Sequence, residues 1–292
     1  MLYFIAFAIS LVVSVFLTPR VLKWAKRRGF VDKPDPRKIH KTPIPRLGGI
    51  AVFSAFWITI IFFQIFFPEK LIFTENKILG IDQNLFGVFI GSLIVFLSGI
   101  LDDIKNLKPF SKLFWQIVAG TIIVIFGINI WWVHNPFGGE NIILNNLTYI
   151  LVPVWIVLLI NVMNWWDGID GQVTGIGIIA AIVLFFLSIS KVVNQPSTAI
   201  LMIVLAGSSF GFLKYNFFPA RIFIGDSGSQ FIGFMLAIGA IISGGKLATA
   251  ALVLGFPILD AFWVISRRLL NGKKIWSADR SHLHHRLLDL GF

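Results

Sequence analysis

Cysteine is missing from the 292-residue chain, and charged residues make up only 13% of it. The absence of cysteine excludes disulfide bonds, thiolate metal sites and a cysteine nucleophile. Soluble domains carry about 25% charged residues, so the scarcity of charge argues against a soluble domain. Hydrophobic residues reach 57%, and 30 Phe and 10 Trp suit lipid-facing surfaces and interfacial belts. The composition therefore predicts a polytopic membrane protein.

Long apolar segments recur along the whole chain. Because a membrane-spanning helix needs about 20 apolar residues, we predict an all-α bundle of about nine to ten transmembrane helices, which forms one integral-membrane domain over residues 1–292. Nine segments lie near residues 2–18, 48–67, 85–101, 113–133, 149–163, 171–190, 198–213, 228–243 and 247–265. The first is expected to stay uncleaved, because the basic run Arg20–Arg28 follows it and no basic region precedes it.

Basic residues outnumber acidic ones, and the net charge is +11. In a soluble protein this charge would suggest nucleic acid, but in a membrane protein positive charge gathers in cytoplasmic loops. With the N-terminus outside, 21 of the 25 Lys and Arg residues fall in the predicted cytoplasmic loops 20–46, 102–112, 164–170, 214–226 and 266–292. We therefore expect a multi-pass protein of the cell (inner) membrane with no nucleic-acid partner.

The stretch from Asn161 to Gly171 carries polar side chains at the junction of two apolar segments. Asn161, Asn164, Asp167 and Asp170 recur at intervals of three residues. Residues three apart share one face of a helix, so we expect a polar stripe at the membrane surface. Charged groups at membrane depth are costly and indicate function. The alternative is a helix-to-helix turn that uses Asp-Gly.

Two adjacent acids, Asp102 and Asp103, end the third apolar segment. They repel each other and meet the negative end of the helix dipole, so the pair requires a cation. One interpretation is a Mg²⁺ or proton-transfer site, because Mg²⁺ prefers one or two carboxylates, waters and substrate phosphates. The other is a solvated acidic end that is neutralised by Lys105, Lys108 and Lys112.

A third acid, Asp226, lies in the sequence Gly225-Asp226-Ser227-Gly228, where the eighth apolar segment begins. Free backbone N–H groups and the positive end of a helix suit phosphate there. An Asp at such a position is also common as a simple N-cap. Because the other acids fall on the same predicted face of the membrane, metal binding is favoured over capping alone.

The final loop carries three imidazoles and a guanidinium, on His282, His284, His285 and Arg286. These groups offer hydrogen-bond donors to phosphate or sugar. A zinc site is disfavoured because the histidines lack the i, i+4 spacing and there is no cysteine; a solvated His-rich tail is the other alternative. The positive-inside rule accounts for the charge of the basic loop Arg37–Lys41, and one or two of its residues can also contact phosphate.

The dense polar clusters fall at the predicted cytoplasmic ends of the apolar segments, and Asp260 inside the ninth segment is the exception. A channel or transporter places such groups near the midplane of the bilayer. The pattern therefore favours an enzyme facing the cytoplasm over a transporter or flippase for an anionic lipid or sugar phosphate. An inactive scaffold is a further alternative.

Five motifs occur along most of the chain, at Pro45–Gly49, Asp102–Pro109, Asn161–Gly171, Asn216–Asp226 and Asp279–Leu287. Together and in this order they resemble the polyprenyl-phosphate N-acetylhexosamine-1-phosphate transferase family. The tail Ser-His-Leu-His-His-Arg-Leu is similar to the branch that moves N-acetylglucosamine-1-phosphate to undecaprenyl phosphate for surface polymers such as teichoic acid. The peptidoglycan branch, phospho-N-acetylmuramoyl-pentapeptide transferase, usually carries three adjacent histidines, which Leu283 interrupts here, and it is the alternative within the family.

The resemblance implies transfer of N-acetylhexosamine-1-phosphate from a UDP-sugar to polyprenyl (undecaprenyl) phosphate in the bilayer, with release of UMP. It implies Mg²⁺ as cofactor, with Mn²⁺ as an alternative, and allows a homodimer. Asp226 resembles the family's Mg²⁺ ligand, and Asp102 or Asp103 resembles the base for the lipid phosphate or a second metal contact. Relatives usually continue with further hydrophobic segments, whereas this chain ends at Phe292, which indicates a short member or an incomplete chain.

The remaining motif residues match substrate-binding positions of the family. Those that hold the uracil ring are matched by Asp170, Asn216 and Phe223. Those that line the nucleotide-sugar cleft are matched by Asn164 and Asp167, which share the predicted stripe with Asn161. Contacts to diphosphate, sugar and phosphate are expected from His282, His284, His285, Arg286 and Lys112.

Overall fold

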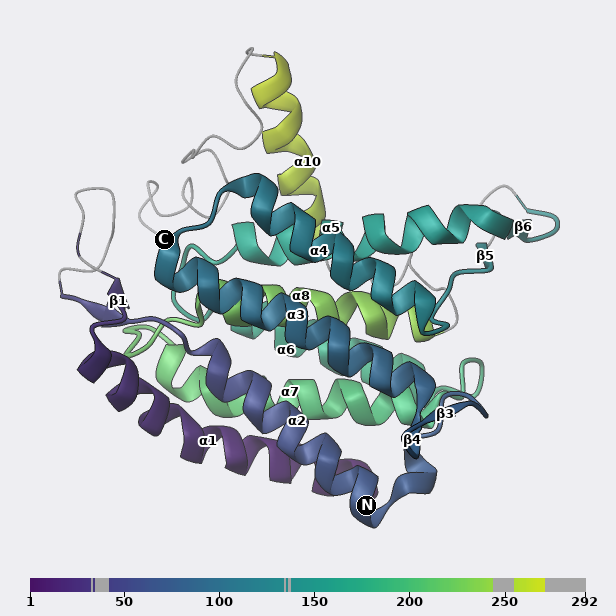
Figure 1. Ribbon diagram of the computed structural model, residues 1–292, viewed down its shortest axis with the longest axis horizontal. Helices are drawn as coiled ribbons and strands as arrows, with labels where there is room; N and C mark the ends of the chain where they lie inside the picture. The colour runs from purple at the N-terminus through teal and green to yellow at the C-terminus, as the bar shows by residue number, and fades with distance from the viewer. Residues whose placement is uncertain (33, 35–41, 134, 136–137, 244–254, 271–292) are drawn as a thin grey trace.

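The computed structural model describes residues 1–32, 34, 42–133, 135, 138–243 and 255–270, and most of them lie in α-helices. Successive helices alternate in direction and pack into a bundle (Figure 1). In chain order they are α1 (Leu2–Arg28), α2 (Gly49–Phe66), α3 (Gln83–Lys105), α4 (Pro109–Ile125), α5 (Thr148–Trp165), α6 (Gln172–Ile189), α7 (Pro196–Asn216) and α8 (Gly225–Ile242). The predicted all-α class is confirmed.

Within the described residues, seven helices are long and apolar enough to cross a membrane, namely α1, α2, α3, α5, α6, α7 and α8. Helix α4 is shorter, with 17 residues, but it packs against both α3 and α5 inside the bundle. The chain is therefore a multi-pass membrane protein. The predicted number of nine to ten spans, and the orientation of the bundle in the membrane, stay predictions.

The first and fourth predicted apolar segments depart clearly from the bounds of the helices in the structure. Helix α1 continues past residue 18 to Arg28 and ends at Gly29, whose φ of 75° is one that glycine readily adopts. The predicted bounds 113–133 of the fourth segment are wrong at both ends. Pro109 begins α4, where the missing N–H of proline is tolerated, and the helix stops at Ile125, shortly before Gly127 with a φ of 94°.

Helix α10 (Gly255–Leu270) stands apart from the others. In Figure 1 it crosses the direction of the bundle, and it contacts α5. The indole Nε1 of Trp166, just after α5, donates a hydrogen bond to Asp260 Oδ2 at 3.2 Å. The predicted ninth span, residues 247–265, begins outside the described residues, and α10 is not among the helices found long enough to cross a membrane. That span is therefore not confirmed.

Three short antiparallel strand pairs order the loops at the two ends of the bundle. They are β1 (Val31–Asp32) with β2 (Ile44–Pro45), β3 (Lys77–Ile78) with β4 (Ile81–Asp82), and β5 (Trp132–Val133) with β6 (Ile142–Ile143). Single 3₁₀ turns, η1 (Pro68–Lys70) and η2 (Asn145–Leu147), lie in the same loops as the later pairs. Figure 1 places β1 at one end of the bundle, called here the site end, and β3 to β6 at the opposite, far end.

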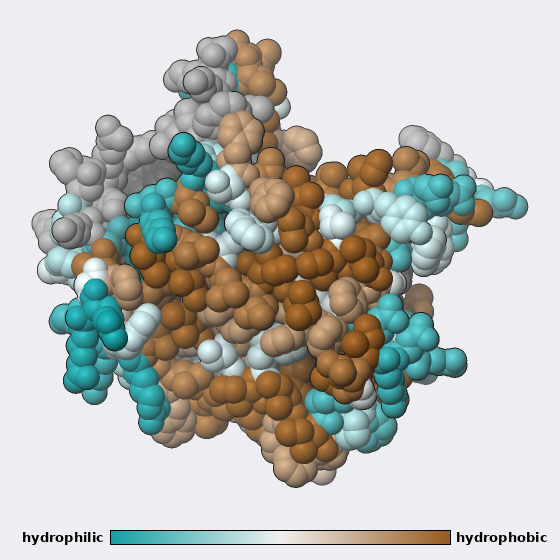
Figure 2. Space-filling model, viewed as in Figure 1, coloured by the Kyte–Doolittle hydropathy of each residue, from teal (hydrophilic) through white to brown (hydrophobic). Residues whose placement is uncertain are grey.

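Helix α8 lies at the centre of the bundle. All its residues from Ser227 to Ile241 are buried, and it packs against α2, α3, α5, α6 and α7. The outer surface is different, because large apolar side chains such as Phe16, Phe66 and Ile125 are exposed. Figure 2 shows apolar side chains across the middle of the visible face and polar ones toward its two ends. This distribution fits a surface that contacts lipid between two aqueous boundaries.

Close packing of α8 against α5 depends on Gly233. A Cβ at this position would lie 2.7 Å from the carbonyl oxygen of Leu159 and 2.8 Å from Cα of Ile160. Because these backbone atoms cannot move aside, we expect Gly233→Ala to lower the free energy of unfolding by about 1–3 kcal/mol. The midpoint of thermal unfolding in detergent should fall accordingly. Gly175→Ala on α6 is the matched control, because nothing lies within 4 Å of its added Cβ. Equal midpoints for the two variants would contradict this packing.

Candidate active site

Four helix ends meet at the site end of the bundle, where α3 and α5 end and α4 and α8 begin. Lys112 Nζ donates a hydrogen bond to Asp226 Oδ2 at 2.9 Å and also forms an ion pair with Asp102. Asn164 Nδ2 donates to Asp226 Oδ1 at 3.0 Å and to Ser229 Oγ at 3.0 Å. We call Asp102, Lys112, Asn164 and Asp226 the acid–lysine cluster. One ammonium group thus joins the acids that were predicted on α3 and α8.

The turn between α3 and α4 places Lys112 beside Asp102. Asp102 Oδ1 accepts a hydrogen bond from the N–H of Leu107 at 2.8 Å, which closes the turn after α3. Asn106, with a φ of 51°, ends the helix and reverses the chain. Lys112 therefore returns to the buried Asp102 carboxylate, while Lys105 and Lys108 remain exposed. Of the three lysines predicted to neutralise the acids, Lys112 is the one for which the structure shows an ion pair.

The neighbouring acid, Asp103, faces α8 instead of Lys112. Its Oδ1 accepts a hydrogen bond from the N–H of Asp226 at 2.8 Å. Its Oδ2 accepts one from the N–H of Ser227 at 3.1 Å and one from the Ser227 hydroxyl at 2.8 Å. Two acids that are adjacent in the sequence therefore serve different partners.

The Pro45–Gly49 motif holds the segment that leads into α8. Phe223 donates its N–H to the carbonyl of Pro45 at 2.9 Å and accepts from the N–H of Gly48 at 2.9 Å. The N–H of Gly49 donates to the carbonyl of Ile224 at 2.8 Å. A Cβ on Gly49 would lie 2.3 Å from the backbone nitrogen of Gly228, so glycine is needed for this contact. The motif thus positions the start of α8 through its backbone.

The predicted polar stripe is only partly present. Helix α5 ends at Trp165, so the spacing of three places Asn161 and Asn164 on one face but does not extend to Asp167 and Asp170. Asn164 reaches Asp226, whereas Asn161 Nδ2 donates to Gln116 Oε1 at 2.6 Å.

Sequence reasoning missed two buried glutamines below the acid–lysine cluster. The amide of Gln116 also donates to Gln230 Oε1 at 3.4 Å, so Asn161, Gln116 and Gln230 form a chain of amides across α5, α4 and α8. Both glutamines are 1% exposed. Each lies four residues after a site residue, Lys112 or Asp226, and this i, i+4 spacing was the signal that could have found them.

Asp170 and Asn216 hold the segment 217–224 between α7 and α8. Asp170 Oδ2 accepts a hydrogen bond from the N–H of Ala220 at 2.8 Å. Asn216 is 4% exposed; it accepts from the Thr174 hydroxyl at 2.8 Å and donates to the carbonyl of Ile222 at 3.1 Å. Two of the residues predicted to bind uracil therefore shape this segment, which contains the third, the partly buried Phe223.

Asp167 lies in the turn between α5 and α6. Burial, followed by the charges of Asp226 and Asp103, raises the pKa of Asp167 well above its ordinary value. The nearby charge of Arg46, which is paired with Asp32 at 2.6 Å, acts in the opposite direction. The raised pKa therefore reflects burial first and the negative charges of Asp226 and Asp103 second.

The predicted contacts from the last loop, His282, His284, His285 and Arg286, lie outside the described residues, as does the basic loop Arg37–Lys41. Within the part of the chain that the structure describes, no group of three or more His, Asp or Glu side chains is placed to hold a metal ion. The donors present are the carboxylates of Asp226 and Asp102, which share one ammonium group. Two carboxylates fit Mg²⁺, which keeps several waters and takes its other ligands from substrate phosphates.

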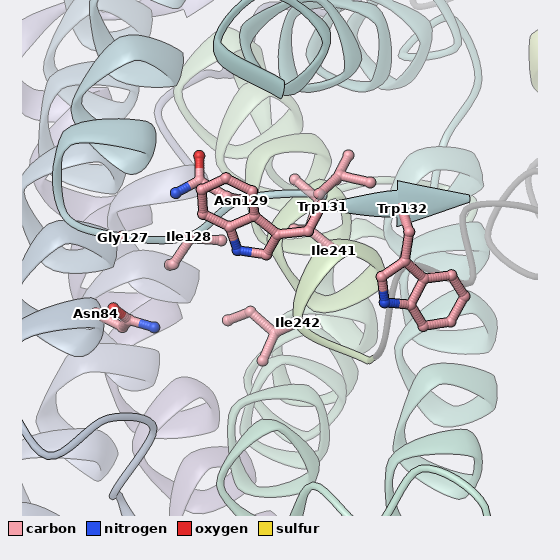
Figure 3. A pocket seen from close by; sticks show the side chains of 9 residues that line it. Asn84, Gly127, Ile128, Asn129, Trp131, Trp132, Ile241 and Ile242 are labelled. Atoms are coloured by element: carbon pink, nitrogen blue, oxygen red, sulfur yellow. The ribbon is translucent and has the colours of Figure 1, made fainter. Parts of the chain in front are cut away.

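A cavity of about 240 Å³ lies at the far end of the bundle. Figure 3 shows the side chains of Asn84, Trp131, Trp132 and Ile242 among those around it. Asn84 and Asp102 lie at opposite ends of α3, on the order of 27 Å apart at about 1.5 Å per residue. The cavity contains none of the predicted site residues and is separate from the acid–lysine cluster.

The sequence profile of Glycosyl transferase family 4 matches residues 85–244, which include the whole acid–lysine cluster. The chain belongs to this family. A Bacillus subtilis (strain 168) protein named "Probable undecaprenyl-phosphate N-acetylglucosaminyl 1-phosphate transferase" is 34% identical over 98% of this chain and 77% of its own length. The predicted family resemblance is thereby confirmed.

Two further family members show the same relationship over nearly the whole chain. The decaprenyl-phosphate N-acetylglucosaminephosphotransferase of Mycobacterium tuberculosis (strain ATCC 25618 / H37Rv) is 32% identical over 96% of this chain and 74% of its own. The undecaprenyl-phosphate alpha-N-acetylglucosaminyl 1-phosphate transferase of Escherichia coli (strain K12) is 27% identical over 96% of this chain and 76% of its own length.

Lys112 pairs with Asp102 and Asp226, the two carboxylates that would hold a divalent cation. We expect Lys112→Met to lower the free energy of unfolding in EDTA by about 1–3 kcal/mol, and with it the midpoint of thermal unfolding, because the buried Asp102 carboxylate and the partly exposed Asp226 carboxylate lose their shared cation. The same variant should gain more thermal stability from added Mg²⁺ or Mn²⁺ than the parent chain does. Lys108→Met, at an exposed position, is the control. An equal gain in parent and variant would show that Lys112 and the cation do not compete.

Proposed function

We propose that the chain transfers N-acetylglucosamine-1-phosphate from UDP-N-acetylglucosamine to undecaprenyl phosphate, or a similar polyprenyl phosphate, and releases UMP. The observation that carries the proposal is the acid–lysine cluster at one end of a bundle of membrane helices, where a lipid phosphate and a water-soluble nucleotide sugar can meet. Three relatives carry names for N-acetylglucosamine phosphate transfer to undecaprenyl or decaprenyl phosphate. Their names support this donor over the muramoyl-pentapeptide donor of the peptidoglycan branch.

In the proposed reaction an oxygen of the lipid phosphate attacks the β-phosphorus of the nucleotide sugar. The bond between this phosphorus and the oxygen that bridges the two phosphates breaks, and its electron pair leaves with UMP. A phosphate monoester loses its second proton near pH 6, so the attacking group needs little help from a base at neutral pH. Direct in-line attack is favoured over a phospho-sugar on an Asp, because the carboxylates of Asp102 and Asp226 are both paired with Lys112, which lowers their nucleophilicity.

The residues of the cluster have separate roles in this proposal. Asp226 and Asp102 would hold Mg²⁺, or Mn²⁺ in its place, which when bound supplies positive charge to the diphosphate. Lys112 adds a second positive charge toward the phosphates, since 27% of its side chain is exposed at the site. Asn164 keeps Asp226 oriented by donating to its Oδ1.

The nucleotide is proposed to bind beside the segment 217–224. Asp170, in the turn before α6, and Asn216, at the end of α7, hold this segment, and Phe223 offers a partly buried ring at its end. An aromatic ring next to fixed backbone groups suits a flat base that needs both stacking and hydrogen bonds. Asn164 and Asp167 then lie on the side of the sugar and diphosphate.

The reaction is tested by UMP release from the purified chain in detergent with undecaprenyl phosphate and Mg²⁺. We expect lipid-dependent UMP from UDP-N-acetylglucosamine, and a fall of about 10²- to 10³-fold in Asp226→Asn, because charge stabilisation in the transition state is lost. Asp82→Asn, a buried acid at the far end of α3, is the matched control. UMP from UDP-N-acetylmuramoyl-pentapeptide alone would favour the peptidoglycan branch. Substrate uptake into vesicles without UMP would favour a transporter.

The active site is proposed to face the cytoplasm. The last turn of α1 carries Lys26, Arg27 and Arg28 and leads directly to β1 at the site end. Positive charge of this kind favours the cytoplasmic side of a membrane.

The lack of native cysteine gives a direct test of orientation, since each introduced thiol is unique. We expect a membrane-impermeant maleimide to label Glu75→Cys, exposed at the far end, in intact cells. Lys105→Cys, exposed at the site end, should react only after the membrane is opened. The reverse pattern would place the active site outside, and the parent chain without cysteine provides the background.

A further inference from the structure

The start of α8 lacks a cap from its own sequence. The N-cap position holds Ile224, whose side chain has no hydrogen-bond acceptor. The first N–H groups of a helix have no partner within the helix, and in a buried position they require one. In α8 the N–H groups of Asp226 and Ser227 donate to the carboxylate of Asp103, which belongs to α3. The cap is therefore supplied by a different helix.

The contact is close enough to fix the position of the first turn. Gly225 has a φ of 70°, and a Cβ on it would lie 2.6 Å from Asp103 Oδ2 and 2.7 Å from Oδ1. One turn earlier on α3, a Cβ on Gly99 would lie 2.5 Å from Cα of Ser227. The backbones of α3 and α8 thus meet directly, with the carboxylate between them. A negative group at a helix N-terminus also interacts favourably with the helix dipole.

We propose that Asp103 is a positioning residue, which caps α8 from α3 and so sets the place of Asp226, and that it neither accepts the proton of the lipid phosphate nor binds the metal ion. This inference rests on the proposed function for its kinetic consequences, but the capping itself does not. Both oxygens of Asp103 are used by the backbone and hydroxyl groups of α8. Of the two adjacent acids, Asp102, whose carboxylate pairs with Lys112, is therefore the one that could bind the cation beside the substrate phosphates.

Asp82 offers a matched control at the opposite end of α3. Its Oδ1 accepts from the N–H groups of Asn84 and Leu85, and its Oδ2 from those of Phe73 and Thr74. Asp82 is therefore also a buried carboxylate at a helix N-terminus, but it is far from the acid–lysine cluster. Asp82→Asn and Asp103→Asn disturb the same kind of contact in two places.

Hydrogen–deuterium exchange tests the capping without any substrate. In Asp103→Asn an N–H₂ group replaces one carboxylate oxygen, so the N–H of Asp226 or of Ser227 loses its acceptor. We therefore expect exchange in the peptide covering residues 225–229 to become at least about tenfold faster. Asp82→Asn should accelerate exchange only around residues 73–74 and 84–85. Unchanged exchange at residues 225–229 in Asp103→Asn would overturn the inference, whether or not the chain transfers a sugar phosphate.

Kinetics separate a positioning role from a base. In Asp103→Asn we expect the Mg²⁺ concentration for half-maximal UMP release to rise about 10- to 100-fold, the usual effect of losing a group that orients a metal ligand. The acidic limb of the pH–rate profile should remain. Ser227→Ala, which removes one of the three hydrogen bonds, should shift the Mg²⁺ requirement in the same direction by less. Loss of the acidic limb with an unchanged Mg²⁺ requirement would identify Asp103 as the base.

Discussion

The shared ammonium group of Lys112 is the interaction on which the site end of this protein depends. Asp102 sits at the C-terminal end of α3, where the helix dipole disfavours an anion, and Asp226 brings a second carboxylate to the same place. In a low-dielectric environment two such groups repel strongly. Lys112 lets the two helix ends converge, and the short turn after α3 ensures that it arrives there.

The convergence also depends on backbone contacts that only glycine permits. Gly49 and Gly99 bring α2 and α3 against the first turn of α8, and Gly233 brings α5 against its middle. Because α8 is buried along its length, a shift of any of these helices would be transmitted to Asp226. The geometry of the acid–lysine cluster therefore depends on the packing of the whole bundle. Glycine is required at these positions because a larger residue would separate the helices.

Sequence reasoning identified the acids and Lys112 because charge is rare in membrane segments and its position is informative. The helical spacing of Asn161 and Asn164 was also sufficient to place them on one face. It failed at Asp167 and Asp170, since periodicity says nothing once α5 ends at Trp165. The different partners of Asp102 and Asp103 could not be predicted either, because they depend on backbone N–H groups of α8, which lie more than a hundred residues away in the sequence.

Charge balance links the structure of the site to the proposed reaction. Among the described residues, the carboxylates of Asp102 and Asp226 face Lys112, and that of Asp103 faces the N–H groups of α8. Arg46 is already paired with Asp32. Burial contributes most to the raised pKa of Asp167, and the negative charges of Asp226 and Asp103 add to it. A diphosphate approaching alone would meet this field and be repelled. In the proposed reaction, the cation that Asp226 and Asp102 would hold would offset this repulsion, and Lys112 would add positive charge toward the phosphates.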